Sequence, residues 1–401
     1  MSIGYQFPTI HNLSDVLPHI DDSFRVVVKD DLTFVNYNMM GNDVFPDVIE
    51  STNSLGSRSA LRAAIRRECR GIVFDTATGD LVSRPFHKFF NAGERESLAL
   101  DLIDVDAEHC VLEKLDGSMI RPLPTVGGIR WGTKMGITDV ALLAETFVAD
   151  KPEYYELARV CAEEGATPIF EFCSRETQIV IDHPVDRMVL TAIRFNWSGE
   201  YMTFVALRNT GTRFGIDVVD RLSVSVGDMT KFVGDVKAET EGEGIVLRFA
   251  DGHMVKVKND WYSRIHRAKD QMRTERNVVA LILAEEMDDL LPALQDVDKY
   301  RMLDFIDSFQ TSVRARIGVL SMAYDVARSY FATKKDYALG SVGGDQINRS
   351  MIFALWDAKA ADAAAAIDRV IRAGLSSETA YGEMKTKLGL NTGWKKKESE
   401  E

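Results

Sequence analysis

The chain has 401 residues, a formal net charge of -13 and four cysteines. This length allows two domains, or one large domain with an appendage. The acidic balance argues against a protein that coats nucleic acid nonspecifically, since such binding depends on an excess of Lys and Arg. The sequence has no run of about 18 apolar residues, no recognisable signal peptide and no CxxC spacing among its cysteines. We therefore expect a cytoplasmic protein with reduced cysteines, no membrane span and no cysteine zinc site.

The first part of the chain has the pattern of an α+β fold. Short apolar stretches that end at Gly, Asn and Asp are typical of strands and turns. The expected elements of this part are, in chain order, a hairpin over 25–37, a helix over 59–69, strands at 71–75 and 81–84, helices at roughly 138–164 and further short strands to about residue 258.

After about residue 260 the apolar pattern becomes helical. One stripe has its members three or four residues apart, and it comprises Met302, Phe305, Ile306, Phe309, Val313, Ile317, Leu320 and Tyr324. A break at 340–344, an Ala-rich helical stretch over 358–373 and a solvated tail at 395–401 are expected after it. We expect two domains, residues 1–265 and an all-helical domain of residues 266–401.

The chemistry centres on Lys114, which directly follows an expected strand at 110–112 and begins the sequence Lys114-Leu115-Asp116-Gly117. Alone, this short motif is better interpreted as a surface turn with a solvated lysine. Three further blocks follow in order: Glu171 in the apolar strand 169–172, Glu243 at the start of the apolar strand 244–247, and Lys256 and Lys258 on one face of the strand 255–258. Together they place an amine, two carboxylates and two further cations on the strands of one domain.

These residue types suit nucleotidyl transfer. An amine nucleophile must be deprotonated, and neighbouring cations or a divalent metal disfavour the protonated form. The same cations stabilise the negative charge that builds on the phosphate in the transition state. The two carboxylates can hold a metal ion or the ribose hydroxyls.

The order KxDG, FEF, EGIVL and KVK followed by WY resembles the lysine-AMP nucleotidyltransferases, which include DNA ligases, RNA ligases and mRNA capping enzymes. The blocks at residues 68–74, 83–91 and 258–262 are similar to those of the phage-type RNA ligase 1 branch in particular. The resemblance runs from about residue 36 to about residue 269. It implies an antiparallel-sheet adenylation domain, followed here by the helical domain.

The resemblance also implies the residue roles. Catalysis is assigned to Lys114, which carries AMP, and to Glu243, Lys134 and Tyr262. ATP contacts are assigned to Tyr37, Arg70, Lys88, Glu171, Lys256 and Lys258. Metal-dependent catalysis is assigned to the pair Asp288 and Asp289.

Simpler interpretations stand beside these roles. Arg70 could belong to a structural ion pair, and Lys88 could be a surface residue. Two aspartates in an acidic helix, like Asp288 and Asp289, are usually its solvated face.

The function implied by the resemblance is ATP-dependent RNA ligation of 5′-phosphate and 3′-hydroxyl ends, with Mg²⁺ or Mn²⁺, in the repair of RNA and above all tRNA in phage-infected cells. We expect a monomer, whose C-terminal helices contact RNA through Arg301, Arg314, Arg316, Arg328, Lys334 and Lys335 or simply expose them to solvent. The alternatives are an inactive module that binds nucleotides and RNA ends, a DNA ligase or a capping guanylyltransferase. The last two normally carry a β-rich domain after the second lysine pair, and no such pattern is present here.

Overall fold

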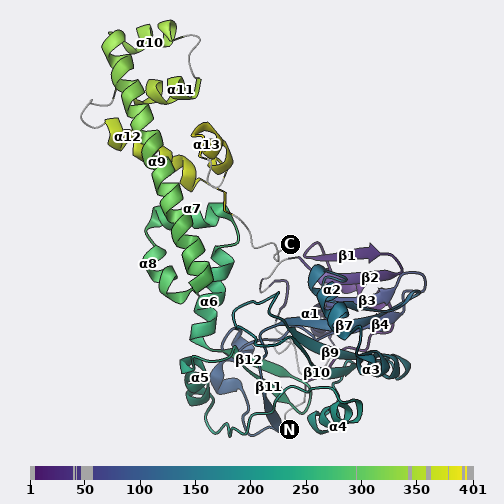
Figure 1. The fold of residues 1–401 in the computed structure, drawn as a ribbon. Helices are drawn as coiled ribbons and strands as arrows, with labels where there is room; N and C mark the ends of the chain where they lie inside the picture. Colours follow the sequence, from purple (N-terminus) through teal and green to yellow (C-terminus); the bar gives the residue numbers. More distant parts are fainter. Residues whose placement is uncertain are drawn as a thin grey trace. The chain divides into compact units, whose positions relative to one another are not determined.

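The computed structural model describes residues 5–38, 41, 43–46, 57–294, 296–341, 346–357, 363–377, 379–390 and 393–394. The chain divides into two units, Met1–Ser263 and Arg264–Glu400. Figure 1 colours the first from purple to teal and the second from green to yellow. The first unit contains antiparallel sheets with helices and the described elements of the second are helical, so the α+β fold class expected from the sequence is confirmed.

Three four-stranded sheets are described in the first unit (Figure 1). The first has the order β1 (Phe24–Lys29), β2 (Leu32–Tyr37), β3 (Arg70–Asp75) and β4 (Leu81–Ser83). The second has the order β10 (Arg187–Phe195), β9 (Ala166–Cys173), β7 (Ser118–Thr125) and β8 (Gly128–Gly132). The third has the order β5 (Phe90–Asn91), β12 (Met254–Lys258), β11 (Gly244–Phe249) and β6 (His109–Glu113). All pairings are antiparallel except that of β12 with β5.

Helices cover the sheets of this unit. They are α1 (Arg58–Glu68), α2 (Asp139–Val148), α3 (Pro152–Glu163), α4 (Phe204–Phe214) and α5 (Met229–Ala238), with short 3-10 turns at Leu13–Asp15, Leu17–His19, Glu96–Leu98 and Leu100–Leu102. The first three agree with the expected helices. Side-chain caps fix several of their starts, as at Ser57, whose hydroxyl accepts the Ala60 amide at 3.1 Å.

The short strands expected between residue 164 and about residue 258 are present, but the sequence analysis missed two helices there, α4 and α5. Both helices contain an internal glycine and β-branched residues, which lower helix propensity and obscured the pattern. Their capping residues were the available signal: Thr203 before α4, left-handed Gly215 after it, and Asp228 before α5.

The second unit begins within α6 (Asp260–Gln271) and contains helices only among its described elements. These are α7 (Glu275–Ala284), α8 (Met287–Leu290), a 3-10 turn at Leu291–Ala293, α9 (Asp296–Tyr330), α10 (Lys334–Gly340), α11 (Gln346–Leu355), α12 (Ala363–Ser376) and α13 (Tyr381–Lys387). Among the described residues, no helix is both long enough and apolar enough to cross a membrane.

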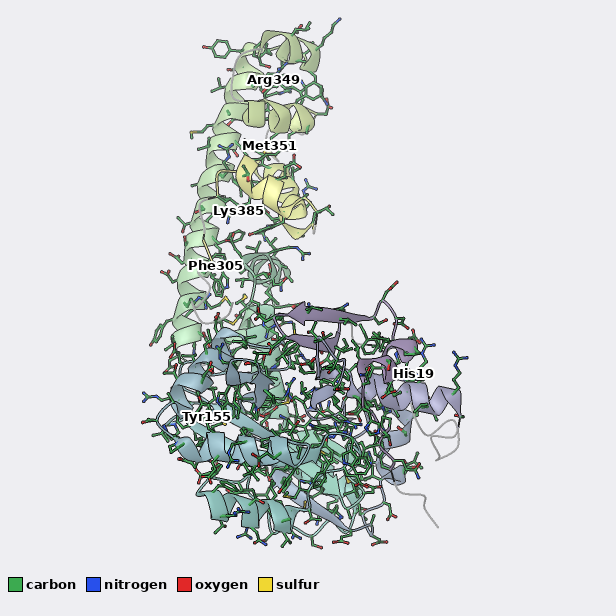
Figure 2. The ribbon with its side chains drawn as sticks, turned by 90° about the vertical axis from the view of Figure 1, so that its right-hand side faces the viewer. His19, Tyr155, Phe305, Arg349, Met351 and Lys385 are labelled. Atoms are coloured by element: carbon green, nitrogen blue, oxygen red, sulfur yellow. The ribbon has the colours of Figure 1, made fainter. Side chains whose placement is uncertain are left out.

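The apolar stripe predicted from the sequence lies on the single helix α9 and forms part of the core of the second unit. Ile306 and Ile317 are partly buried, and the other members of the stripe are buried. Figure 2 labels Phe305 on α9, whose ring packs edge-on against Trp394 with the ring centroids 5.1 Å apart. It also labels Arg349 of α11, which donates to the carbonyl of Ala338 at 2.6 Å.

Several expectations lie partly or wholly outside the described residues. They are the break at 340–344, of which 342–345 are not described, the start of the Ala-rich stretch at 358–362, and the tail at 395–401.

Candidate active site

Strand pairing brings Lys114, Glu243 and Lys258 together in the first unit. β11 pairs with both β6 and β12, so that Gly244 lies opposite Lys258 and its carbonyl accepts the Lys114 amide at 3.0 Å. Glu243, one residue before β11, is buried. Its Oε2 lies 2.6 Å from the Lys114 Nζ, and its Oε1 lies 2.9 Å from the Lys258 Nζ. The carboxylate thereby fixes two amines at one place.

Both amines face a pocket of about 320 Å³. Its apolar wall is formed by Phe86, Phe89, Leu112, Leu115, Met119, Val219, Val246 and Met254. Its charged residues include Arg70, Glu171 and Lys256 together with Lys114 and Lys258. Apolar walls with a few convergent charged groups are typical of sites for small ligands. This combination suits a nucleotide, with its base against the wall and its phosphates at the cations.

Glu171 lies on β9 opposite Met119 of β7 and faces this pocket. Burial raises the pKa of its carboxyl to about 7, Lys114 opposes the shift and Glu243 adds to it. Among the described residues, Glu171 has no hydrogen-bond or ion-pair partner. A half-buried carboxyl that faces a pocket without a partner is available to a ribose hydroxyl or to a divalent cation, both of which bind carboxyl oxygens.

The turn after Lys114 approaches β9 so closely that only glycine fits there. A Cβ atom at Gly117 would lie 2.5 Å from the carbonyl oxygen of Phe172 and 3.1 Å from the Glu171 Cγ. The glycine of the motif therefore brings the Lys114 turn against the strand that carries Glu171.

A second group consists of Tyr37 and three cations around it. We call the three cations, Arg70, Lys88 and Lys134, the cation cluster. The Lys134 Nζ lies 3.3 Å from the Tyr37 hydroxyl, and the Lys88 Nζ lies 5.9 Å from the centroid of the Tyr37 ring. Burial raises the pKa of the Tyr37 hydroxyl, but the charges of Lys134, Arg70 and Lys88 outweigh it, so the pKa lies below its usual range.

Within the described part of the chain, no cation of the cluster forms an ion pair. Lys88 is buried and lies over the rings of Tyr37, Phe45 and Phe90, and the Arg70 Nη1 has the sulfur of Met119 at 3.7 Å. The simpler interpretations of Arg70 as part of an ion pair and of Lys88 as a surface residue are therefore wrong. Positive charges gathered without an ion-paired carboxylate favour a phosphate ligand.

Lys256 connects the cluster to the pocket. Burial and the charges of Lys88 and Lys114 lower the pKa of its amine to about 7. Burial also lowers the pKa of Lys88, with a further contribution from Arg70. Such shifts show that these cations repel each other at short range, and an anionic ligand between them would relieve that repulsion.

Tyr262 lies behind the lysines rather than in the pocket. Its hydroxyl donates to Asp116 Oδ1 at 2.7 Å, and its ring lies 4.9 Å from the Lys258 Nζ. The other oxygen of Asp116 accepts the amides of Val180 and Ile181 at 2.8 and 2.6 Å. Asp116 thus ties the Lys114 turn to α6 and to the segment after β9. The sequence motif contains Asp116, but the pattern alone gives it no such role.

Buried arginines hold the strands that carry the cation cluster. Arg84 and Arg194 both pair with Glu68, at 3.0 and 2.8 Å, and all three side chains are almost inaccessible. Arg121 donates to Ser83 Oγ at 2.8 Å, to the Thr133 carbonyl at 3.2 Å and to the Gly71 carbonyl.

Arg121 thus binds the carbonyl groups of Gly71 and Thr133, which are adjacent in the chain to Arg70 and Lys134. Arg121 is fully buried, and burial together with Arg70 lowers its pKa to about 9. The sequence analysis did not predict the buried arginines Arg84, Arg121 and Arg194, because a buried arginine is recognised only once its partners are known.

Asp288 and Asp289 lie on α8 in the second unit. Asp288 is exposed, and the side chain of Asp289 lies outside the described residues. No group of three or more His, Cys, Asp and Glu side chains in the described part of the chain is placed to hold a metal ion. The metal role of this pair stays a prediction.

The paired lysines and the carboxylates beside a nucleotide-sized pocket are the groups that nucleotidyl transfer to a lysine requires. Residues 68–262 match the family described as RNA ligase. This segment is similar to the ATP-dependent RNA ligases, including RNA ligase 1 of a bacteriophage.

Two relatives of this chain are also described as RNA ligases. A protein of Thermovibrio ammonificans described as a putative RNA ligase is 27% identical over 75% of this chain and 77% of its own length. RNA ligase 1 of bacteriophage TS2126 is 28% identical over 57% of this chain and 58% of its own. Among solved structures, an archaeal ATP-dependent RNA ligase is 12% identical, with a TM-score of 0.44 over 64% of each chain.

Proposed function

We propose that this chain seals RNA ends in three steps, with Lys114 as the nucleophile. The observation that carries the proposal is the Lys114 amine, fixed by Glu243 at 2.6 Å beside the nucleotide-sized pocket. The Lys114 Nζ attacks the α-phosphorus of ATP, a P–N bond forms, and the P–O bond to pyrophosphate breaks. Glu243 orients the amine, and its Oε2 lies within reach of the proton that the amine loses.

The next two steps use the RNA ends. An oxygen of the RNA 5′-phosphate attacks the phosphorus of the lysine adduct, the P–N bond breaks and the amine of Lys114 regains a proton. A 3′-hydroxyl of RNA then attacks the 5′-phosphate and loses its proton to solvent, a phosphodiester bond forms, and the P–O bond to AMP breaks so that AMP leaves. In the first step, Arg70 and Lys88 hold the pyrophosphate part of ATP, Lys256 holds the negative charge of the phosphates, and Lys134 with Tyr37 completes that cluster.

Mg²⁺ or Mn²⁺, when bound, supplies charge that neutralises phosphate oxygens. Glu171 fits such an ion best, since its carboxyl faces the pocket and has no partner among the described residues. A ribose hydroxyl is the alternative partner of Glu171. The assignment of Asp288 and Asp289 to the metal is part of the proposal.

The setting follows from the family. We propose that the substrates are RNA ends with a 5′-phosphate and a 3′-hydroxyl, tRNA among them, and that the enzyme acts as a monomer in the cytoplasm of a phage-infected cell. Residues 266–401 are assigned to substrate recognition. Arg314 and Lys335 are exposed there, whereas Arg301 and Arg328 lie over the rings of Trp394 and Trp356. Lys334 pairs with Asp357 at 2.9 Å.

Incubation with α-labelled ATP or GTP and Mg²⁺ tests the proposal. We expect label from ATP that stays on the protein after denaturation. A protein without label is a binding module, and label from GTP alone indicates a capping enzyme. If sealing is restricted to DNA ends, the chain is a DNA ligase.

A further inference from the structure

A second, smaller pocket of about 100 Å³ lies on the first sheet, and no step of the proposed reaction uses it. It is lined by Arg25, Val27, Lys29, Phe34, Asn36, Lys134 and Met135. β1 is the edge strand of the sheet (Figure 1). Alternate residues of a strand share a face, and antiparallel partners directly opposite each other do as well. Arg25 lies opposite Asn36 and Val27 opposite Phe34, so these side chains and Lys29 belong to one face.

The cations of this pocket meet only neutral atoms in the described part of the chain. The Lys29 Nζ lies 3.1 Å from the Met135 carbonyl oxygen, and an Arg25 Nη atom lies 3.2 Å from the Met135 sulfur. Asp30 and Asp31 are in the adjacent turn. The Asp31 carboxylate accepts the Val126 amide at 2.6 Å, and neither aspartate lies within ion-pair distance of Lys29.

Lys134 joins this pocket to the active site. It lines the small pocket, and its Nζ also contacts the Tyr37 hydroxyl beside the cation cluster at 3.3 Å. The positive charges therefore continue from Lys256 through Arg70 and Lys134 to Lys29 and Arg25. The small pocket has a volume of about 100 Å³ and the main pocket about 320 Å³, so a phosphate group fits in the small one and a nucleoside does not.

We propose that Arg25 and Lys29 bind a backbone phosphate of the RNA close to its reacting end, while the adenylyl group occupies the main pocket. The inference rests on the proposed function and extends it to the substrate strand. Charge complementarity favours RNA as the occupant. The protein as a whole carries a net charge of -13, whereas this row of cations runs from the active site to the small pocket. Contacts to phosphate position a nucleic acid without reading its bases, so we expect no sequence preference at this pocket.

The test uses the full-length double variant Arg25→Ala/Lys29→Ala. Its matched control is Arg208→Ala/Lys237→Ala, which removes two exposed cations from α4 and α5. Each protein is assayed for label uptake from ATP and for sealing of pre-adenylylated RNA over a range of RNA and salt concentrations. The charge-preserving variant Arg25→Lys/Lys29→Arg completes the set.

For the double variant we expect label uptake within about twofold of wild type. The RNA concentration for half-maximal sealing should rise by at least about tenfold, since the loss of even one charge-assisted hydrogen bond has that effect, with the rate at saturating RNA unchanged. The log–log salt slope should fall by roughly 0.7 for each RNA phosphate that the protein no longer neutralises. The charge-preserving variant should recover most of the RNA affinity.

Two outcomes would overturn the inference. One is an RNA dependence equal to that of the control variant. The other is a rise in the half-saturating concentration of ATP instead of RNA, which would assign the pocket to the nucleotide phosphates or to the placement of Lys134. Neither touches the proposed function, which the wild-type protein decides in the same assay: without covalent label and sealing, the proposed function itself fails.

Discussion

The two units of the molecule are stabilised in different ways. In the first, buried Glu68, Arg84, Arg121 and Arg194 lie beneath the cation cluster. In the second, the described core consists of apolar side chains and the rings of Tyr and Trp. Every buried Asp, Glu, Lys, Arg, His, Asn, Ser and Thr in the described part of the chain lies at or before Asn259.

Burying a charge costs free energy that apolar packing does not cost. In the first unit, such buried charges hold the backbone next to Arg70, Lys88 and Lys134. The positions of these three residues are therefore fixed by buried ion pairs and hydrogen bonds, which cost more free energy than apolar packing does. The second unit has no comparable requirement in its core.

The largest effect expected is on covalent chemistry in the first unit. Lys114→Ala removes the nucleophile, and Lys114→Arg keeps a side chain that stays protonated and cannot attack phosphorus. Both variants should lose label uptake from ATP by more than about a thousandfold. The measurement is label retained after denaturation, and covalent uptake by Lys114→Arg would contradict the assignment.

The second prediction compares the two cores directly. Glu68→Gln leaves Arg84 and Arg194 buried without a carboxylate and should lower the free energy of unfolding by about 3–5 kcal/mol. Met302→Leu in the second unit conserves volume and should cost less than about 1.5 kcal/mol. Denaturant unfolding of both full-length variants measures the difference. Equal costs would show that the buried ion group has no special role in stability.

The third prediction separates the reaction steps. Arg70→Ala and Lys88→Ala should each lower ATP-dependent adenylylation by roughly tenfold to a hundredfold, the effect of removing one hydrogen bond to a charged group. Sealing of pre-adenylylated RNA should change by less than about threefold, because pyrophosphate is absent. Both steps are measured on the same preparation. An equal loss in the two steps would remove the pyrophosphate role from these residues.

The fourth prediction uses the lowered pKa of Lys256, about 7. Below pH 7 the amine is charged and attracts phosphate, and that attraction is lost as the pH rises through 7. The half-saturating concentration of ATP should therefore rise by up to about tenfold between pH 6 and 8. Lys256→Arg keeps its charge over this range and should give a flatter profile. The same slope in both proteins would contradict the role of the Lys256 charge.

The smallest effect concerns the surface of the second unit. Arg314→Ala/Lys335→Ala removes two exposed cations and should raise the half-saturating concentration of tRNA-like ends by roughly threefold. Short linear RNA is the internal control and should be unaffected. If the two substrates respond equally, the helices have no part in substrate choice.

The sequence was sufficient for the parts of the site that lie on regular strands. Lys256 and Lys258 alternate along β12, so the strand period identified their common face, and both line the pocket. The stripe on α9 was predicted for the same reason. The repeat of apolar or charged residues along a strand or helix is a local property, so it can be found from the sequence alone.

Other parts depend on interactions between distant residues. Asp116 meets Tyr262 across 146 positions, and Arg194 meets Glu68 across 126. No local pattern predicts such partners. The helices α4 and α5 were missed because internal glycines lower their propensity, although Gly211 is required where a Cβ atom would collide with Val218.

One measurement tests the central claim most directly. The protein is labelled with α-labelled ATP, freed from nucleotide, and mixed with 5′-phosphorylated RNA in the absence of ATP, and the labelled peptide is mapped before the chase. We predict that the label lies on Lys114 and passes to the RNA 5′ end, and that free AMP appears when a 3′-hydroxyl is sealed. Label on another residue, or label on Lys114 that does not move to RNA, would contradict the account.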